Sequence, residues 1–292
     1  MTAAVLHDVL SAAVRQLRDA GLDPAAAAAD VEVLARHVLG WDRARLLAHR
    51  RDPAPPAFVE RFAALIERRV DRVPVAYLTG TREFYGLDFE VTPAVLIPRP
   101  ETELAVDVAL DALPSRSGGR AIDVGTGSGC IAVALAVARP GAAVVAVDRS
   151  AGALRVARRN ARRHGVDDRV AFILGDLLTA LAPRHLVDVV VSNPPYVPDG
   201  SPDVAVDVAR HEPASALYAG PDGLDVVRRL LVDAARVVRP GGRLVVEIGV
   251  GQAEAVSAAA AAHGAWAAAT FRDDLQGIAR VAVLSRLGAI DR

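Results

Sequence analysis

A group of glycines follows an apolar run near the middle of the chain. The run Ala121 to Val124 has the pattern of a buried strand, and a helical pattern begins at Cys130. Glycine lets the backbone turn tightly and leaves room for a ligand that a side chain would block. A loop of this kind at the carboxyl end of a strand binds nucleotide-like molecules in open α/β sheets. The residues that we predict to bind a cofactor here are Gly125, Thr126, Gly127, Ser128 and Gly129.

The spacing of these glycines discriminates between cofactors. A dinucleotide fingerprint requires its third glycine at the sixth position, which is Cys130 here, whereas Gly129 is fifth. A phosphate-binding loop of the GxxxxGK type requires lysine, which the chain lacks. The pattern D-x-G-x-G-x-G, which begins at Asp123, is instead typical of methyltransferases that use S-adenosylmethionine.

Acidic residues stand at the ends of the next two predicted strands. Asp148 ends the second strand, where a carboxylate can accept hydrogen bonds from both ribose hydroxyls of NAD or of S-adenosylmethionine. Asp176 ends the third strand and is placed to meet the adenine amino group. Either residue could instead cap the helix that follows. Together with the glycine loop, however, the two acids predict a cofactor site.

The fourth predicted strand runs into the tetrapeptide Asn193-Pro194-Pro195-Tyr196. A planar amino group, as in an amide or a nucleobase, attacks poorly because its lone pair is delocalised. The Asn193 side-chain oxygen and the Pro194 carbonyl can accept its two N–H bonds and hold the nitrogen in place. The two prolines fix the direction of that carbonyl, and Tyr196 offers a face for a planar substrate. We predict methyl transfer that depends on positioning, without a strong base.

These motifs require an alternating pattern of strands and helices, and the chain has one after Arg120. Buried-looking strands that alternate with helices predict a doubly wound, mostly parallel sheet. The last two strands have only a short connection, Arg272 to Gly277, so one of them should be antiparallel. The predicted strands are Ala121 to Val124, Ala143 to Val147, Val170 to Leu174, Val187 to Val191, Arg243 to Ile248, and a final pair around Trp266 to Phe271 and Ile278 to Leu284.

The rest of the chain divides into two further regions. From Ala3 to about Arg72 the apolar residues recur at helical spacing, which predicts a small all-helical domain. Aromatic and β-branched residues around Gly86 predict a hairpin in the following linker. We therefore expect a helical domain at residues 1–73, a linker with a β-hairpin at 74–103, and an S-adenosylmethionine-dependent methyltransferase domain at 104–292.

The composition excludes several classes of protein. The 34 basic residues are all arginine and nearly balance 35 acidic residues, so no polybasic surface is available to bind phosphate backbones by charge alone. The single cysteine, Cys130, excludes an intramolecular disulfide and a cysteine-based zinc site. The histidines show no ligand spacing, so no metal is predicted. Without a leader pattern or a long apolar segment, we expect a cytoplasmic protein that binds neither membrane nor nucleic acid.

The linker carries a family resemblance. The segment FYGLDFEVTPAVLIPRPETE resembles, nearly residue for residue, the pattern F-x-G-x-x-F-x-V-x-x-x-V-L-I-P-R-P-E-T-E of the HemK/PrmC family of peptide chain release factor glutamine methyltransferases. Further similarities are Asn160, Glu212-Pro213 with Ala216-Leu217, Glu247-Ile248-Gly249 with Gln252, and Asp274 to Arg280.

The resemblance implies a class I, Rossmann-like fold and methylation of the amide nitrogen (N5) of the glutamine in the Gly-Gly-Gln motif of class 1 release factors. It also implies that residues 125–129 and Asp148 bind the cofactor, and that residues 193–196 bind the glutamine, with Asn193 contacting both. Two positions depart from the family pattern. Leu177 replaces an aromatic residue of some relatives, so adenine would rest on an aliphatic side chain. Residues 219–223 replace a Gly-Gly-x-Asp-Gly pattern.

Other functions share these motifs. A sister family with the same tetrapeptide methylates glutamine in a ribosomal protein, and adenine N6 methyltransferases of nucleic acid share it too. Near-neutral charge disfavours the second alternative. A binding module that has lost catalysis is disfavoured by the intact Asn193 and the intact glycine loop. We expect a class 1 release factor as the partner, docked by the helical domain.

Overall fold

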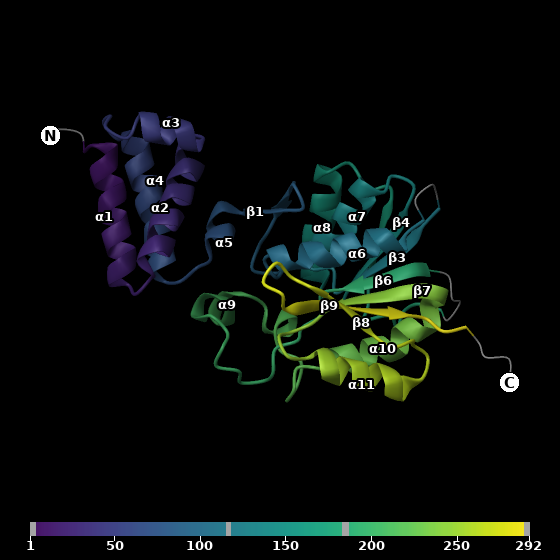
Figure 1. Cartoon of the computed structure of the whole chain (residues 1–292). Coiled ribbons are helices and arrows are strands. Elements are labelled where there is room, and N and C mark those ends of the chain that lie inside the picture. Colours follow the sequence, from purple (N-terminus) through teal and green to yellow (C-terminus); the bar gives the residue numbers. More distant parts are fainter. Residues whose placement is uncertain (1–3, 115–117, 183–186, 289–292) are drawn as a thin grey trace. The chain divides into compact units, whose positions relative to one another are not determined.

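A computed structural model describes residues 4–114, 118–182 and 187–288, and the chain divides into two compact units (Figure 1). The first unit comprises Met1–Thr81 and Val204–His211, and the second comprises Arg82–Asp203 and Glu212–Arg292. Ala3 and the extreme ends of the predicted domain ranges lie outside the described residues. The chain therefore passes from one unit to the other at three places, after residues 81, 203 and 211.

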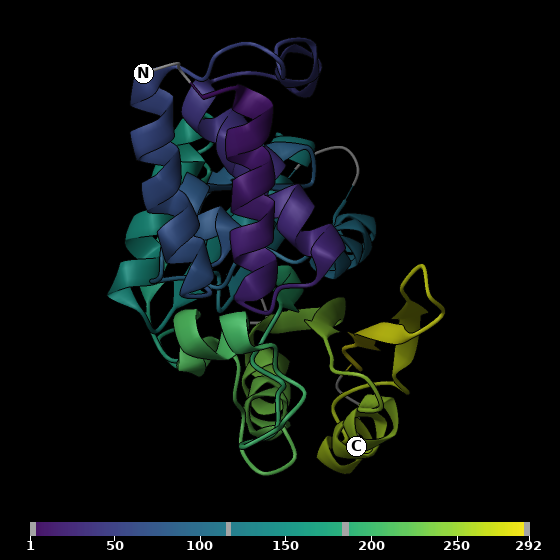
Figure 2. The same cartoon turned by 90° about the vertical axis from the view of Figure 1, so that its left-hand side faces the viewer.

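The first unit is helical, as predicted. Leu17, Leu34, Phe62 and Ile66 are among the fully buried side chains of its core. The three longest helices, α1, α2 and α4, lie side by side (Figure 2). The helices of this unit are α1 (Leu6–Asp19), α2 (Pro24–Leu39), α3 (Arg43–Ala48), α4 (Pro56–Val70), α5 (Val75–Thr79) and α9 (Val206–His211).

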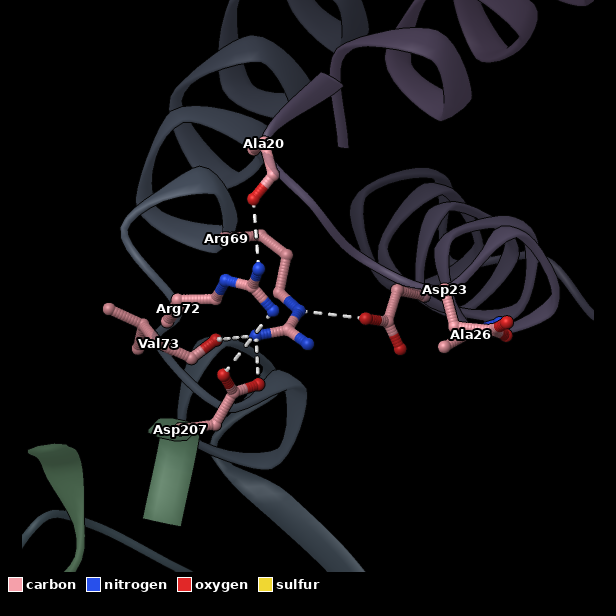
Figure 3. Close-up of polar contacts among 8 residues, drawn as sticks. Ala20, Asp23, Ala26, Arg69, Arg72, Val73 and Asp207 are labelled. Carbon is pink, nitrogen blue, oxygen red and sulfur yellow. Dashed lines mark hydrogen bonds and ion pairs between the residues drawn. The ribbon is translucent and has the colours of Figure 1, made fainter. Parts of the chain in front are cut away.

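One element of this unit, α9, comes from much later in the chain. Arg69 at the end of α4 is buried, and its Nη1 donates to Asp207 Oδ2 of α9 at 2.7 Å, while its Nε donates to Asp30 Oδ2 at 2.7 Å. Arg72 Nη1 lies 3.8 Å from Asp207 Oδ1. Figure 3 shows Arg69, Arg72 and Asp207 turned toward one another. Burial on its own would lower the pKa of Arg69, but the hydrogen bonds to the two carboxylates raise it.

The predicted hairpin is present. Its strands are β1 (Thr81–Phe84) and β2 (Leu87–Glu90). Tyr85 and Gly86 form the turn with φ of 54° and 72°, as a two-residue turn with two positive φ angles requires. Tyr85 adopts this conformation while its backbone N–H donates to Glu103 and its hydroxyl donates to Asp107. After the hairpin, the linker ends in the short 3₁₀ helix η1 (Pro100–Thr102).

The second unit contains a seven-stranded sheet in the order β5-β4-β3-β6-β7-β9-β8. The first five strands of that order are parallel, and β9 is antiparallel to both β7 and β8, which confirms the prediction for the final pair. The strands are β3 (Arg120–Val124), β4 (Ala143–Asp148), β5 (Val170–Leu174), β6 (Val187–Ser192), β7 (Val238–Glu247), β8 (Thr270–Asp273) and β9 (Ala279–Ser285).

Helices cover both faces of the sheet. On one face lie α6 (Glu103–Ala112), α7 (Cys130–Ala138) and α8 (Ala151–Arg163), and on the other lie α10 (Asp225–Val237) and α11 (Ala253–His263) (Figure 1). Successive strand residues alternate between two buried clusters: Ala121 and Val189 belong to the α7 side, whereas Ile122 and Val190 belong to the α10 side. Because both faces are buried, most residues of the central strands are apolar, and Asp123 of β3 is a buried exception.

Two predicted strand boundaries are wrong. We expected β7 to begin at Arg243, but it begins at Val238 and contains the Pro-Gly-Gly sequence. Its pairing with β6 is irregular between Val187 and Val189, so a bulge accommodates residues that resemble a turn. The strand predicted around Trp266 begins at Thr270, because Trp266 makes only an isolated bridge with Arg286. Within the described part of the chain, none of the helices has both the length and the apolar character needed to cross a membrane.

Candidate active site

A cavity of about 220 Å³ lies at the carboxyl ends of β3, β4, β5 and β6. Parallel sheets place the ends of successive strands at one edge, where ligands bind. The predicted site residues that line this cavity are Gly125, Thr126, Gly127, Ser128, Asp148, Asp176, Leu177, Asn193, Pro194 and Pro195. Gly129 and Tyr196 are not among its lining residues.

The three glycines of the loop differ in what their missing side chains allow. All have positive φ, at 71° for Gly125, 55° for Gly127 and 82° for Gly129. A Cβ added to Gly125 would have no heavy atom within 4 Å, so the backbone is open to a ligand. A Cβ added to Gly129 would lie 3.0 Å from Ala157 Cβ of α8. The first glycine therefore leaves ligand space, and the third permits close packing of two helices.

A buried carboxylate lies under the glycine loop. Asp123 Oδ2 accepts hydrogen bonds from the Thr126 hydroxyl at 2.6 Å and from the Ala132 backbone N–H at 3.1 Å. Burial raises the pKa of Asp123 to about 7, although these two hydrogen bonds oppose the shift. The Thr126 hydroxyl is thus engaged with Asp123 and stabilises the loop.

Asp148 joins the glycine loop to the next helix. Its Oδ2 accepts from the Gly127 backbone N–H at 2.9 Å, and its Oδ1 accepts from the Ser150 N–H at 2.8 Å. The Ser150 hydroxyl caps α8 by accepting from the Ala153 N–H. Ser150 is therefore the residue that caps the helix, and Asp148 remains at the end of β4, beside the cavity.

Asp176 and Leu177 lie at the third strand end. The Asp176 carboxylate is half exposed and forms an ion pair with Arg229 of α10. The residues after Asp176 form a turn, so it does not cap a helix. Leu177 has a φ of 50°, a strained value for a residue with a side chain. Such strain persists where the surroundings impose it, and here it accompanies a position on the cavity wall.

The tetrapeptide follows β6 directly. The Ser192 hydroxyl donates to the Val124 carbonyl at 2.7 Å, which ties the end of β6 to the end of β3 beside the glycine loop. Asn193 and Pro194 therefore reach the same cavity as the loop. The Tyr196 carbonyl accepts from Gln252 Nε2 at 3.0 Å, so the end of the tetrapeptide is also held.

Two residues next to the tetrapeptide, Thr102 of the cavity wall and the buried Glu247, were not predicted as site residues. Asn193 Nδ2 donates to Thr102 Oγ1 at 2.9 Å, and Thr102 Oγ1 donates to Glu247 Oε2 at 2.6 Å. The Tyr196 hydroxyl donates to Glu247 Oε1 at 3.3 Å. Burial raises the pKa of Glu247 to about 7 and also raises the pKa of Tyr196. Both Thr102 and Glu247 fall in segments that carry the family resemblance, which was the only signal that could have found them.

Another buried acid, Glu212, holds the linker. Glu212 Oε2 accepts from the Ile97 backbone N–H at 3.0 Å, and its Oε1 accepts from Arg99 Nη2 at 2.6 Å. The side chain of Glu212 is almost fully buried. These contacts fix the Ile97-Pro98-Arg99 segment, which leads into η1 and Thr102, and so position one wall of the cavity.

The fold and the site together define a class of enzyme. A mostly parallel seven-stranded sheet, with a glycine loop after its first strand and Asn-Pro-Pro-Tyr after its fourth, is that of a class I methyltransferase that uses S-adenosylmethionine. The open space above Gly125 and the position of Asp148 fit this group. The fold is shared with the solved hMettl16 catalytic domain, with a TM-score of 0.56 and 16% identity over 80% of this chain and 82% of that chain.

Comparisons of the sequence identify the family more narrowly than the fold does. The family model described as "PrmC N-terminal domain" matches residues 8–80, and "Methyltransferase small domain" matches residues 99–212. The chain is 44% identical to the release factor glutamine methyltransferase of Burkholderia pseudomallei, over 92% of this chain and 94% of that protein. It is 45% identical to that of Moorella thermoacetica, over 89% and 91%. The chain belongs to the release factor glutamine methyltransferase family.

Proposed function

We propose that this enzyme transfers the methyl group of S-adenosylmethionine to the side-chain amide nitrogen (N5) of the glutamine in the Gly-Gly-Gln motif of class 1 peptide chain release factors. The observation that carries the proposal is the position of Asn193 and Pro194 in the same cavity as the glycine loop. Two acceptors suited to an amide –NH₂ thus stand beside the place where the methyl donor is expected. The family membership supports the choice of substrate.

The proposed cofactor-binding residues are those of the glycine loop, Asp148, Asp176 and Leu177, with Asn193 contacting both cofactor and substrate. When bound, S-adenosylmethionine supplies a methyl carbon on a positively charged sulfur. The loop backbone faces the ligand space, and Asp148 lies where the ribose hydroxyls are expected. Asp176 already forms an ion pair with Arg229. We propose that the carboxylate lone pairs not used by Arg229 accept hydrogen bonds from the adenine amino group.

The chain's own residues contribute positioning. Asn193 Oδ1 and the Pro194 carbonyl accept the two N–H bonds of the glutamine amide and keep the nitrogen pointed at the methyl carbon. The nitrogen gains a bond to the methyl carbon as the carbon–sulfur bond breaks, and one amide proton leaves to solvent. The two carbonyl oxygens also stabilise the positive charge that develops on the nitrogen. Tyr196, fixed through Glu247 and Gln252, supports the loop that presents these acceptors.

We assign docking of the release factor to the helical region at residues 1–73, with the linker at 74–103 joining it to the methyltransferase domain at 104–292. The formal net charge of −1 supports a protein partner in preference to nucleic acid. Because release factors act in translation, we place the reaction in the cytoplasm.

The proposal is tested by incubating the protein with methyl-labelled S-adenosylmethionine and, separately, with purified class 1 release factors, ribosomal protein and DNA. We expect label on the release factor, and none when its Gly-Gly-Gln glutamine is replaced by alanine. Label on ribosomal protein or DNA, with the release factor unlabelled, would refute the proposal.

A further inference from the structure

The side-chain amide of Asn193 is held by a chain of buried hydrogen bonds. Its Nδ2 lies 2.9 Å from Thr102 Oγ1, which lies 2.6 Å from Glu247 Oε2. Thr102 is 1% exposed and Glu247 is 2% exposed, so water does not compete for either group. Thr102 comes from the end of the linker and Glu247 from the end of β7. The chain of hydrogen bonds therefore joins three segments that are distant in the sequence.

The direction of these hydrogen bonds follows from what each group can donate. Above its raised pKa of about 7 the Glu247 carboxylate carries no proton and can only accept, so the single proton of the Thr102 hydroxyl is directed to it. Thr102 Oγ1 must then accept from Asn193, and only the –NH₂ side of the asparagine amide can donate. If the amide were rotated by half a turn, two acceptors would face each other inside the protein, at the cost of an unsatisfied buried group. Asn193 Oδ1 is consequently left as the atom for other partners.

We propose that Thr102 is a positioning residue for methyl transfer: with Glu247 behind it, Thr102 fixes the Asn193 amide so that the oxygen, and not the nitrogen, meets the substrate amide. The inference rests on the proposed function, since it concerns an acceptor for a substrate N–H. It also gives the linker a role in the reaction, because Thr102 is the last residue of η1.

Glu247 has a further contact that supports this role. Its second oxygen accepts from the Tyr196 hydroxyl at 3.3 Å. Both ends of the tetrapeptide are thus connected to one buried carboxylate, Asn193 through Thr102 and Tyr196 directly. A shift of Glu247 would disturb both ends, whereas loss of the Thr102 hydroxyl removes only the connection to Asn193. Thr102 is therefore the residue that tests the proposal cleanly.

The experiment is run at pH 8, where the Glu247 carboxyl is ionised. It compares Thr102→Val, which removes the hydroxyl at nearly constant volume, with Thr102→Ser, which keeps it. Thr270→Val on the exposed edge strand β8 is the matched control. We expect Thr102→Val to lower kcat at least tenfold, on the scale of losing one oriented group in a transition state. KM for the release factor and Kd for S-adenosylhomocysteine should change less than about threefold. Thr102→Ser should restore kcat to within about threefold of wild type, and Thr270→Val should match wild type.

Two results would overturn the proposal. One is a Thr102→Val enzyme whose kcat stays within about threefold of wild type. The other is a loss of kcat accompanied by an equal loss of S-adenosylhomocysteine affinity or by a thermal midpoint well below that of Thr270→Val, which would make Thr102 merely structural. If Thr102→Val does not fold, Thr102→Ala removes the same hydroxyl without placing a methyl group beside Glu247.

The wild-type arm separates this inference from the proposed function. Transfer to the release factor by wild type supports the function whatever the variants do. If wild type labels a different amide acceptor, the proposed function fails, and the same variants are compared on that acceptor. The role of Thr102 is then still tested by the ratio of kcat between Thr102→Ser and Thr102→Val on that acceptor.

Discussion

At the scale of single residues, the two asparagines of this chain show how the same side chain can serve chemistry or structure. Asn193 faces the cavity and is held from behind. Asn160 is fully buried: its Oδ1 accepts from the Glu90 N–H, and its Nδ2 donates to the Glu90 and Ser128 carbonyls. Asn160 thus fastens the linker and the glycine loop to α8, whereas Asn193 keeps an acceptor for the substrate.

This contrast predicts that Asn193→Ala loses catalytic rate, whereas Asn160→Ala loses stability and ligand affinity. Asn193→Ala should bind S-adenosylhomocysteine within a few-fold of wild type but lose about 100-fold or more in kcat, because one oriented acceptor is gone. Asn160→Ala should lose both thermal stability and S-adenosylhomocysteine affinity, because it leaves buried partners unsatisfied. Calorimetry and steady-state kinetics on both variants give the comparison. Unchanged turnover in Asn193→Ala would remove Asn193 from the mechanism.

Glu247 predicts a pH dependence of stability. Burial raises its pKa from a usual 4.5 to about 7 in the folded protein. Between these values the folded state keeps a proton that the unfolded state releases. The free energy of unfolding should therefore fall as pH rises through 7, by up to about 3 kcal/mol.

Glu247→Gln cannot release this proton, so its stability should depend less on pH. Urea unfolding of both proteins at pH 5 and pH 8 measures the difference. Asp123, whose pKa is also raised to about 7 by burial, is present in both proteins and cancels in the comparison. Equal pH slopes for the two proteins would contradict the assignment to Glu247.

At the scale of elements, the sequence predicts the framework well and its side-chain contacts poorly. The strand from Val170 to Leu174 and the hairpin around Gly86 appear as expected because local patterns report local burial. The Pro-Gly-Gly sequence suggests a break, yet a bulge keeps it within β7. Thr102 and Glu247 lie 145 positions apart, and no local pattern encodes which distant side chains meet.

The glycine loop gives a prediction at this scale. Gly129→Ala should cost more stability than Gly165→Ala, which has a similar positive φ of 65° but open space around its Cβ. Both alanine variants are destabilised by backbone strain of about 1–2 kcal/mol. Only at Gly129, however, does the new Cβ contact Ala157 of α8. We expect an excess of about 1 kcal/mol or more from overpacking. Denaturant unfolding of both variants measures it, and equal costs would mean that α7 and α8 adjust freely.

Gly125→Ala completes this series. Its Cβ would enter open space, so its stability should match that of Gly165→Ala. Its affinity for S-adenosylhomocysteine should fall at least about tenfold, because the methyl group occupies ligand space. An affinity equal to that of Gly165→Ala would place the cofactor elsewhere.

At the scale of the whole molecule, the first unit is not a continuous stretch of sequence. It holds α9 through Asp207, whose carboxylate is bound by Arg69 and lies near Arg72. His211 adds a second contact, with Nε2 3.1 Å from the Asp71 carbonyl. The segment Val204–His211 is therefore part of the fold of the N-terminal unit.

Asp207→Asn should loosen this segment. Arg69 keeps Asp30 but loses a partly buried charged partner, for which we expect a cost of about 1–3 kcal/mol. Hydrogen exchange of the α9 amides should accelerate in Asp207→Asn and stay at the wild-type rate in Asp203→Asn, an exposed acid just before the segment. Identical exchange in both variants would show that the ion pair does not hold α9.

The three passages of the chain between its units also limit how this architecture can be exchanged between relatives. A cut at a single point, such as after Thr81, yields an N-terminal piece whose Arg69 has lost Asp207 and a C-terminal piece that carries α9 without the helices it packs on. A functional chimera must therefore carry residues 204–211 together with the N-terminal helices of the same parent. The two stretches form one structural module, although more than a hundred residues of another unit separate them.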